Sequence, residues 1–177
     1  MGAAKPPQKR RARKPAALPA RIMLDSGVVI RALEYANPAR AGDARVSDCR
    51  TLWVRALKEC RVLMPPFVVL EVLGGDGAPP QFPIARAVEH VAFSYQAAEL
   101  MARWSTPDMK KRLARETKTA RRVVTYDALI VGTAQFHQAD VLVTLDDDVK
   151  ALAKLARVHV AEPKDLLWGT QGNLFAT

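Results

Sequence analysis

The sequence predicts an α/β fold, a three-layer α/β/α sandwich around a central, mainly parallel sheet. Short apolar runs alternate with helical segments along most of the chain, and strands separated by helices pair in parallel through right-handed crossovers. The 177 residues are 49% hydrophobic and 25% charged, which is the composition of one compact domain. The longest nearly apolar run, 62–70, contains two prolines and is too short to span a membrane.

Hydrophobic periodicity and prolines place the elements in the first half of the chain. Cys49, Leu52 and Ala56 fall three and four positions apart, which predicts an amphipathic helix with a buried apolar stripe. Pro38 ends one helical segment, and Pro66 opens another. We therefore expect strands at 21–24 and 61–64, helices at 26–35, 43–59 and 66–73, and a loop at 74–83.

The second half continues this alternation around one basic insertion. We expect strands at 88–93, 141–144 and 157–160, helices at 95–104, 125–137 and 147–156, and a turn and tail from 162 onward. The insertion is a basic helical segment at 105–122, with a helix start at Thr106-Pro107. The predicted organisation is a disordered basic arm at 1–20, one domain at 21–167 and a C-terminal tail at 168–177.

The net charge of +9 and the pI near 9.9 favour a polyanionic partner such as nucleic acid. The charge is concentrated in two segments. Residues 1–20 hold six basic residues and no acid, and 105–122 hold seven against two acids, so the rest of the chain has 14 basic and 16 acidic residues. The arm is either a solvated tail or binds nucleic acid. The second segment is either a nucleic-acid clamp or an ordinary solvated helix.

The two cysteines indicate a reducing compartment. Cys49 and Cys60 lie eleven residues apart in one predicted helix, about 16 Å along its axis, so they cannot pair with each other there. The sequence shows neither a disulfide framework nor a hydrophobic stretch of signal type. We therefore expect a cytoplasmic protein.

Four carboxylates occupy positions near the carboxyl ends of predicted strands, where functional groups gather in open parallel sheets. Asp25 ends the first strand, and Glu71 lies in the helix after the second. Asp127 begins a helix, and Asp146 follows the last long apolar strand. Each alone has a structural explanation, because Asp caps helices and a lone Glu in a helix is usually solvated. As a set they differ, since Glu71 and Asp127 interrupt otherwise apolar stretches.

If the four carboxylates converge, they require a counter-charge. Each close pair costs about 4 kcal/mol at 4 Å with an effective dielectric near 20. Hard oxygen ligands suit Mg²⁺ or Mn²⁺, so we expect one of these cations. Zinc is excluded because His90, His137 and His159 are isolated and no cysteine pair has zinc-site spacing. The sequence also lacks a phosphate-binding glycine motif and a serine nucleophile elbow.

In these residues the chain resembles a PIN-domain nuclease, and within that superfamily it most resembles VapC-type toxin ribonucleases. The resemblance runs from 21 to about 167 and rests on four motifs in order: 24–26, 66–71 before Gly74, 126–130 with Ala134, and 143–146. One such motif is weak, but four at these spacings are fairly specific. The resemblance implies a PIN-like fold and a metal-dependent endoribonuclease that holds one or two Mg²⁺ or Mn²⁺ ions against the scissile phosphate.

Carried over residue by residue, the resemblance assigns the site. The implied catalytic and metal-binding residues are Asp25, Glu71, Asp127 and Asp146, and the implied supporting residues are Ser26 and Thr144. The basic segment then supplies the predicted RNA-binding residues, which are Lys110, Lys111, Arg112, Arg115, Lys118, Arg121 and Arg122. The implied partners are an RNA substrate, a small antitoxin that covers the acidic rim and a second copy in a homodimer packed through helices.

Two departures from the family pattern leave an alternative open. Gly27 stands where the family often has a polar residue, and Asp147 and Asp148 compete with Asp146 for the metal-facing position, which we assign to Asp146 because it follows Thr144-Leu145. The alternative function is a non-cleaving RNA-binding PIN-like module. Two other acid-using α/β classes fit worse. A haloacid-dehalogenase-type phosphatase needs an Asp at position 27, and a response-regulator receiver needs paired acids at the first strand and a later Lys.

Overall fold

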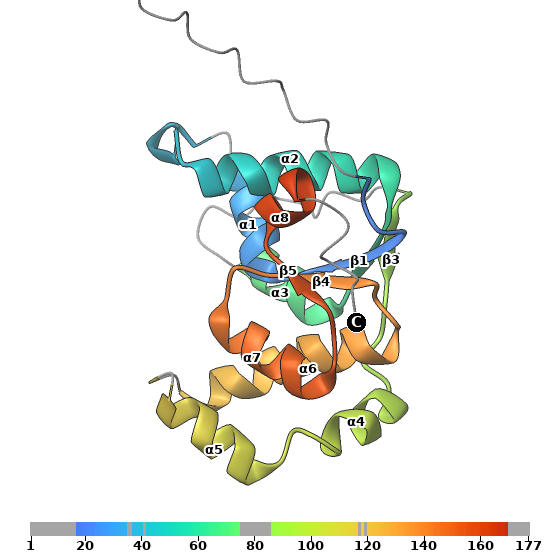
Figure 1. Cartoon of the computed structure of the whole chain (residues 1–177), viewed down its shortest axis with the longest axis vertical. Helices are drawn as coiled ribbons and strands as arrows, with labels where there is room; N and C mark the ends of the chain where they lie inside the picture. The colour runs from blue at the N-terminus through green and yellow to red at the C-terminus, as the bar shows by residue number, and fades with distance from the viewer. Residues whose placement is uncertain are drawn as a thin grey trace, which may run out of the picture.

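A computed structural model describes residues 17–34, 37–40, 42–74, 86–116, 118 and 120–169 of the chain, without the side chains of 38, 121 and 122. Most of the predicted basic arm and C-terminal tail, and the predicted loop beyond Gly74, lie outside these residues. Five described strands form one sheet in the order β3-β2-β1-β4-β5, flanked by helices on both faces (Figure 1). The predicted three-layer α/β/α sandwich is confirmed.

Every strand pair in this sheet is parallel. The sheet consists of β1 (Arg21–Leu24), β2 (Arg61–Met64), β3 (Val88–His90), β4 (Val141–Val143) and β5 (Val160–Ala161). The central strand β1 pairs Ile22 with Val62 of β2 on one side and with Val141 of β4 on the other. Because helices cover both faces, the central strands are apolar apart from the Arg that opens β1 and β2, whereas the edge strand β3 contains Glu89 and His90. The carboxyl ends of the strands share one edge, which we call the carboxyl edge.

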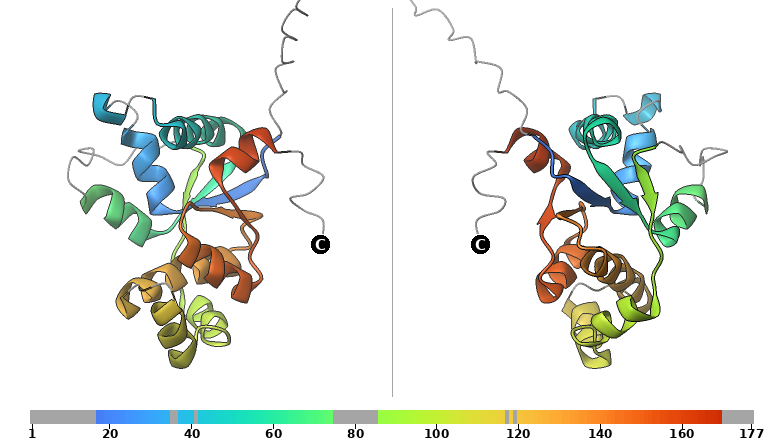
Figure 2. Two further views of the ribbon diagram at one scale, coloured as in Figure 1. Left: turned by 60° about the vertical axis from the view of Figure 1, so that its left-hand side comes forward. Right: turned by 90° about the vertical axis from the view of Figure 1, so that its right-hand side faces the viewer.

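The helices form the two outer layers. One face carries α1 (Ser26–Leu33), α2 (Ala44–Glu59), α3 (Pro66–Gly74) and α8 (Pro163–Trp168), and the other carries α4 (Tyr95–Ala102), α5 (Pro107–Glu116), α6 (Arg121–Phe136) and α7 (Asp147–Ala156) (Figures 1 and 2). A short 3-10 helix, η2 (Pro38–Arg40), precedes α2. No described helix is long and apolar enough to cross a membrane.

A single apolar core lies between the sheet and the two helical layers. Met23, Leu24 and Leu142 on the central strands are fully buried. The predicted stripe of α2 is also in the core, where Cys49, Leu52 and Ala56 are fully buried. Burial of this apolar surface supplies most of the driving force for folding, and it fixes the strand ends from which the candidate site is built.

The prediction of one continuous basic helical segment at 105–122 is wrong. The structure divides it into α5, which ends at Glu116, and the start of α6, which begins at Arg121 rather than at 125. Between them Lys118 has a φ of 56°, a left-handed conformation that a continuous α-helix does not contain. As a consequence, Asp127 lies inside α6 and does not begin the helix.

The end of the domain also differs from the prediction. Arg157 caps α7 with a φ of 56°, so the last strand starts only at Val160, which pairs with Leu142. The predicted turn after Glu162 is instead the helix α8, which Pro163 opens and which buries Leu166 and Leu167. Six residues are too few to show a helical period in the sequence. The elements α1, α4 and β3 end a few residues earlier than expected.

Candidate active site at the carboxyl edge

Asp25 lies where β1 leaves the sheet. Its backbone N–H donates to the carbonyl of Val143 at 3.0 Å, which fixes the end of β1 against the end of β4. Asp25 is the N-cap residue of α1, yet its side chain caps no N–H group, so the structural explanation of an Asp at this position fails. The side chain is only 6% exposed, and burial raises the pKa of this carboxyl.

The Asp25 carboxylate is held by two hydroxyl groups. Thr144 Oγ1 donates to Asp25 Oδ2 at 2.7 Å, and Ser26 Oγ donates to Asp25 Oδ1 at 3.4 Å. The hydrogen bond from Thr144 partly opposes the effect of burial on the pKa of Asp25. Ser26 and Thr144, the two predicted supporting residues, therefore both contact Asp25.

Thr144 also connects Asp25 to Asp146. The backbone N–H of Asp146 donates to Thr144 Oγ1 at 2.9 Å, so this hydroxyl donates one hydrogen bond to Asp25 and accepts another from the backbone of Asp146. Asp146 itself caps α7, since its Oδ1 accepts from the backbone N–H of Asp148 at 2.7 Å. The side chain of Asp146 therefore caps the helix through one oxygen, Oδ1, and it is exposed at the carboxyl edge.

Asp127 has the most unusual environment of the four predicted acids. Its Oδ2 is buried and has no hydrogen-bond partner among the described residues, which is costly for a carboxylate. The pKa of Asp127 is raised to about 7, chiefly by burial and then by the negative charges of Asp146, Asp25, Asp148 and Glu71, in that order. A carboxyl in this position is stable as an ion only with a counter-charge beside it.

The four predicted acids therefore share one electrostatic environment, although they differ in exposure. Glu71, on α3, is exposed and contributes the least of the four neighbours to the pKa of Asp127. It also raises the pKa of Asp25. Glu71 thus lies at the rim of the cluster, while Asp25 is buried and Asp127 is half-buried with one fully buried oxygen.

A fifth member of the cluster is Asp148, which competes with Asp146 for the metal-facing position in the sequence and is not among the predicted site residues. This residue is only 8% exposed, and its charge raises the pKa of Asp127. Asp147, between the two neighbouring acids, points to solvent and pairs with Lys150 at 2.8 Å. The available signal was the helical spacing, because Asp148 lies next to Val149 and four residues before Leu152, both on the buried stripe of α7.

The chemistry of these residues fits a hard divalent cation. Five carboxylates supply oxygen ligands and uncompensated negative charge, and one of them, Asp127, has a buried oxygen without a hydrogen-bond partner among the described residues. In the described part of the chain, no three acidic, histidine or cysteine side chains stand close enough to hold an ion as they are placed. Mg²⁺ commonly keeps several waters and uses one or two carboxylates, so a closed protein cage is not required for it.

The predicted RNA-binding residues lie on α5, in the turn that follows it and at the start of α6. Lys110, Lys111, Arg112 and Arg115 belong to α5, which packs beside α6 below the sheet (Figure 1). Lys111 pairs with Asp108 at 3.9 Å and Arg112 with Glu116 at 3.7 Å, all four side chains being exposed. Lys118 lies in the turn before α6, whereas the side chains of Arg121 and Arg122 lie outside the described structure.

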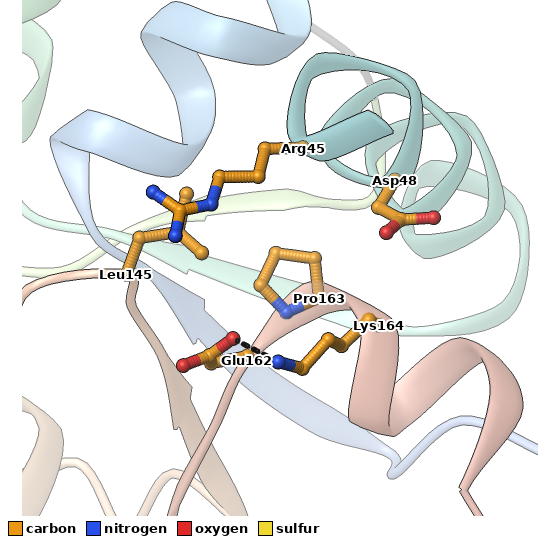
Figure 3. A pocket seen from close by; sticks show the side chains of 6 residues that line it. All are labelled: Arg45, Asp48, Leu145, Glu162, Pro163 and Lys164. Carbon is orange, nitrogen blue, oxygen red and sulfur yellow. Dashed lines mark ion pairs between the residues drawn. The ribbon is translucent and has the colours of Figure 1, made fainter. Parts of the chain in front are cut away.

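A small pocket lies next to the cluster, beyond the connection between β4 and α7. Its lining contains none of the predicted site residues and consists of Arg45, Asp48, Leu145, Glu162, Pro163 and Lys164 (Figure 3). Glu162 forms ion pairs with Lys150 at 2.8 Å and with Lys164 at 3.0 Å. These pairs join the start of α8 to α7, so they support the loop that carries Asp146.

The fold and the cluster define a class of protein, a parallel α/β sandwich with an acidic group at the carboxyl edge of its sheet. The family model for the PIN domain matches residues 22–155. The chain belongs to the PIN domain family.

The chain is also similar to solved structures of other proteins. No curated protein matches the sequence. The crystal structure of VapBC2 from Rickettsia felis, bound to a DNA fragment from their promoter, is similar to this chain at 12% sequence identity with a TM-score of 0.48. The similarity covers 80% of this chain and 97% of that one.

Proposed function

We propose that the protein is a metal-dependent endoribonuclease that hydrolyses RNA phosphodiester bonds, and that it is a VapC-type toxin. PIN domains are generally divalent-metal-dependent nucleases, and the four sequence motifs favour the VapC type. The observation that carries the proposal is the environment of Asp127. Its unpartnered, buried oxygen and its pKa near 7 result from burial beside four other carboxylates, an arrangement that costs folding stability unless a cation is bound.

Each residue of the site has a defined part in this proposal. Asp25, Asp127 and Asp146 would hold Mg²⁺ or Mn²⁺, with Glu71 and Asp148 at the margin. When bound, such a cation lowers the pKa of water and stabilises negative charge on a phosphate. Thr144 fixes the orientation of Asp25 and the position of Asp146. No nucleophilic side chain is needed, because water attacks the phosphorus atom.

A cleavage assay tests the proposal directly. Purified protein is mixed with structured RNAs in Mg²⁺, in Mn²⁺ and in EDTA, and the ends of the products are mapped. We expect cutting that requires the metal and falls at least 100-fold in Asp25→Asn, in line with the loss of a main metal ligand or transition-state contact. Asp147→Asn is the matched control, because Asp147 is exposed and faces Lys150. Cutting that ignores EDTA, or that survives Asp25→Asn, contradicts this mechanism.

The alternative, a non-cleaving RNA-binding module, is favoured by Gly27 and by the exposed basic side chains of α5. It requires RNA binding that weakens with salt and no metal-dependent product from any RNA tested. Detectable metal-dependent cutting rejects it.

The proposed partners are a small antitoxin over the acidic rim and a second copy of the chain. Expression with the neighbouring small gene product should yield a complex that copurifies and inhibits cutting, and size-exclusion chromatography with light scattering should give a dimer. Unrestricted growth on overexpression of the chain alone, with no copurifying partner, contradicts the toxin assignment and leaves the nuclease assignment to the cleavage assay.

A further inference from the structure

Arg31 reaches back along α1 toward the candidate active site. Its Nη1 donates to the backbone carbonyl of Gly27, one helical turn earlier, at 3.0 Å. A Cβ atom on Gly27 would lie 3.3 Å from this Nη1 and 3.9 Å from Asp25 Oδ2. The guanidinium therefore occupies the space beside residue 27, close to the Asp25 carboxylate, and it can do so because glycine has no side chain.

This guanidinium is largely uncommitted. Arginine has five N–H donors in a fixed plane. Among the described residues, Arg31 donates a hydrogen bond to Gly27 and forms no ion pair. Its charge also lowers the pKa of Cys49 on α2, which places it between α1 and α2. The remaining donors of this half-buried cation are therefore available to an anionic ligand beside the cluster of carboxylates.

We propose that Arg31, held beside Gly27 at the start of α1, binds a phosphate of the RNA strand next to the carboxylates. The inference rests on the proposed function, since it names a substrate-binding residue of the same site. It gives Gly27 a role as well, because the glycine allows the guanidinium to approach where other side chains would stand. Arginine suits phosphate because two of its N–H groups can donate to two phosphate oxygens at once.

The charge balance of the site supports a phosphate in this place. Five carboxylates share the carboxyl edge, and RNA carries a negative charge on every nucleotide. The carboxylates therefore repel the strand unless cations neutralise the charge of the carboxylates and of the phosphates. A metal ion offsets the carboxylates at their centre. Arg31 lies at the margin, on the α1 side, where a neighbouring phosphate of an extended strand would pass.

RNA binding in EDTA tests the proposal without cleavage. The probe is a short fluorescein-labelled single-stranded RNA, and its affinity for the full chain is measured by anisotropy over a range of salt concentrations. We expect Arg31→Gln to weaken binding about 10-fold and to reduce the salt slope by about 0.7. Arg31→Lys should keep the slope and lose about 3-fold in affinity, because it retains the charge and loses the planar pair of donors.

Two further variants separate binding from folding. Arg61→Gln is the matched control, since Arg61 begins β2 at the opposite edge of the sheet, exposed and paired with Glu89 at 3.5 Å. It should leave both affinity and slope unchanged. Gly27→Ala keeps the charge of Arg31 but places a methyl group against its Nη1. We expect it to weaken RNA binding and to make a second change at Arg31 add little.

The outcomes distinguish this inference from the proposed function. Arg31→Gln with unaltered RNA affinity and slope overturns the inference even if the chain cuts RNA. Arg31→Gln with lower thermal stability or tighter Mn²⁺ binding, and no change toward RNA, assigns Arg31 to neutralising the carboxylates and also overturns it. Arg31-dependent binding by a chain that never cuts supports the inference for phosphate recognition and rejects the nuclease.

Discussion

Thr144 Oγ1 donates a 2.7 Å hydrogen bond to Asp25 Oδ2, across a separation of 119 residues in sequence. The two residues follow neighbouring strands, β4 and β1, and both are buried. The same hydroxyl accepts the backbone N–H of Asp146. One small side chain thereby sets the positions of two acids, so its loss should affect the stability of the fold and the geometry of the site at once.

Thr144→Val should destabilise the protein and impair its site together. Valine has nearly the same shape but leaves Asp25 Oδ2 and the Asp146 N–H without a partner, which costs about 1–3 kcal/mol for buried groups. We expect a lower free energy of unfolding in urea and weaker RNA cleavage. Thr144→Ser is the control, because it retains the hydroxyl and loses only a methyl group. A valine variant as stable and active as wild type contradicts the role assigned to this hydrogen bond.

Asp127→Asn should stabilise the metal-free protein. Its pKa is raised from 3.8 to about 7, so the folded state holds a proton that the unfolded state has lost, and stability falls as the pH rises between these values. At pH 8 in EDTA, asparagine removes this cost, on the order of 1–2 kcal/mol, or roughly 2–8 °C in Tm. Mn²⁺ should then stabilise wild type more than the variant. A lower Tm for Asp127→Asn in EDTA contradicts this account.

Asp148 and Asp147 provide a comparison between adjacent acids. Asp148 is buried and raises the pKa of Asp127, whereas Asp147 is exposed beside Lys150. Asp148→Asn should lower RNA cleavage about 10-fold or more, as expected for a group that acts on the reacting centre, and should weaken stabilisation by Mn²⁺. Asp147→Asn should match wild type in both assays. Equal effects of the two substitutions contradict the placement of Asp148 in the cluster.

The parts of the structure that sequence reasoning placed well depend on local signals. The bounds of β1, β2 and α7 are as predicted, because Asp25 follows β1, Pro65 follows β2 and Asp146 precedes α7 as its N-cap. Asp25 and Asp146 follow such strand ends, and parallel pairing brings strand ends to one edge. Their proximity therefore follows from fold class alone.

The parts that sequence reasoning missed depend on tertiary structure. Arg121 and Arg122 extend a basic run in sequence, yet they start α6, and this shift moves Asp127 from a helix start to the interior of a helix. The burial of Asp148 depends on which face of α7 packs against α6. The position of Arg31 over Gly27 depends on a side-chain conformation, which no pattern of residue types specifies.

The ion pairs of Glu162 predict an acid-dependent loss of stability. Hydrogen bonds from Lys150 and then Lys164 lower the pKa of Glu162 from 4.5 to about 2. Because the folded-state pKa is depressed, this stabilisation is present above about pH 4.5 and is lost as the pH falls toward 2. Wild type should unfold at higher urea than Glu162→Gln at pH 7, and the difference should vanish near pH 2. A difference that is independent of pH contradicts this assignment, and its size should be small because the pair is near solvent.

The basic helix α5 should act on RNA through charge and not through base recognition. Arg115 and Lys118 are exposed, and no ion pair is found for either within the described structure. If they contact phosphates, Arg115→Gln and Lys118→Gln should each weaken binding to all single-stranded RNAs alike and reduce the salt slope by about 0.7 per residue. Lys154→Gln, an exposed lysine on α7, serves as the charge-matched control. Equal salt slopes for wild type and the three variants would identify α5 as an ordinary solvated helix. The acidic site with Arg31 would then remain as the proposed RNA-binding surface.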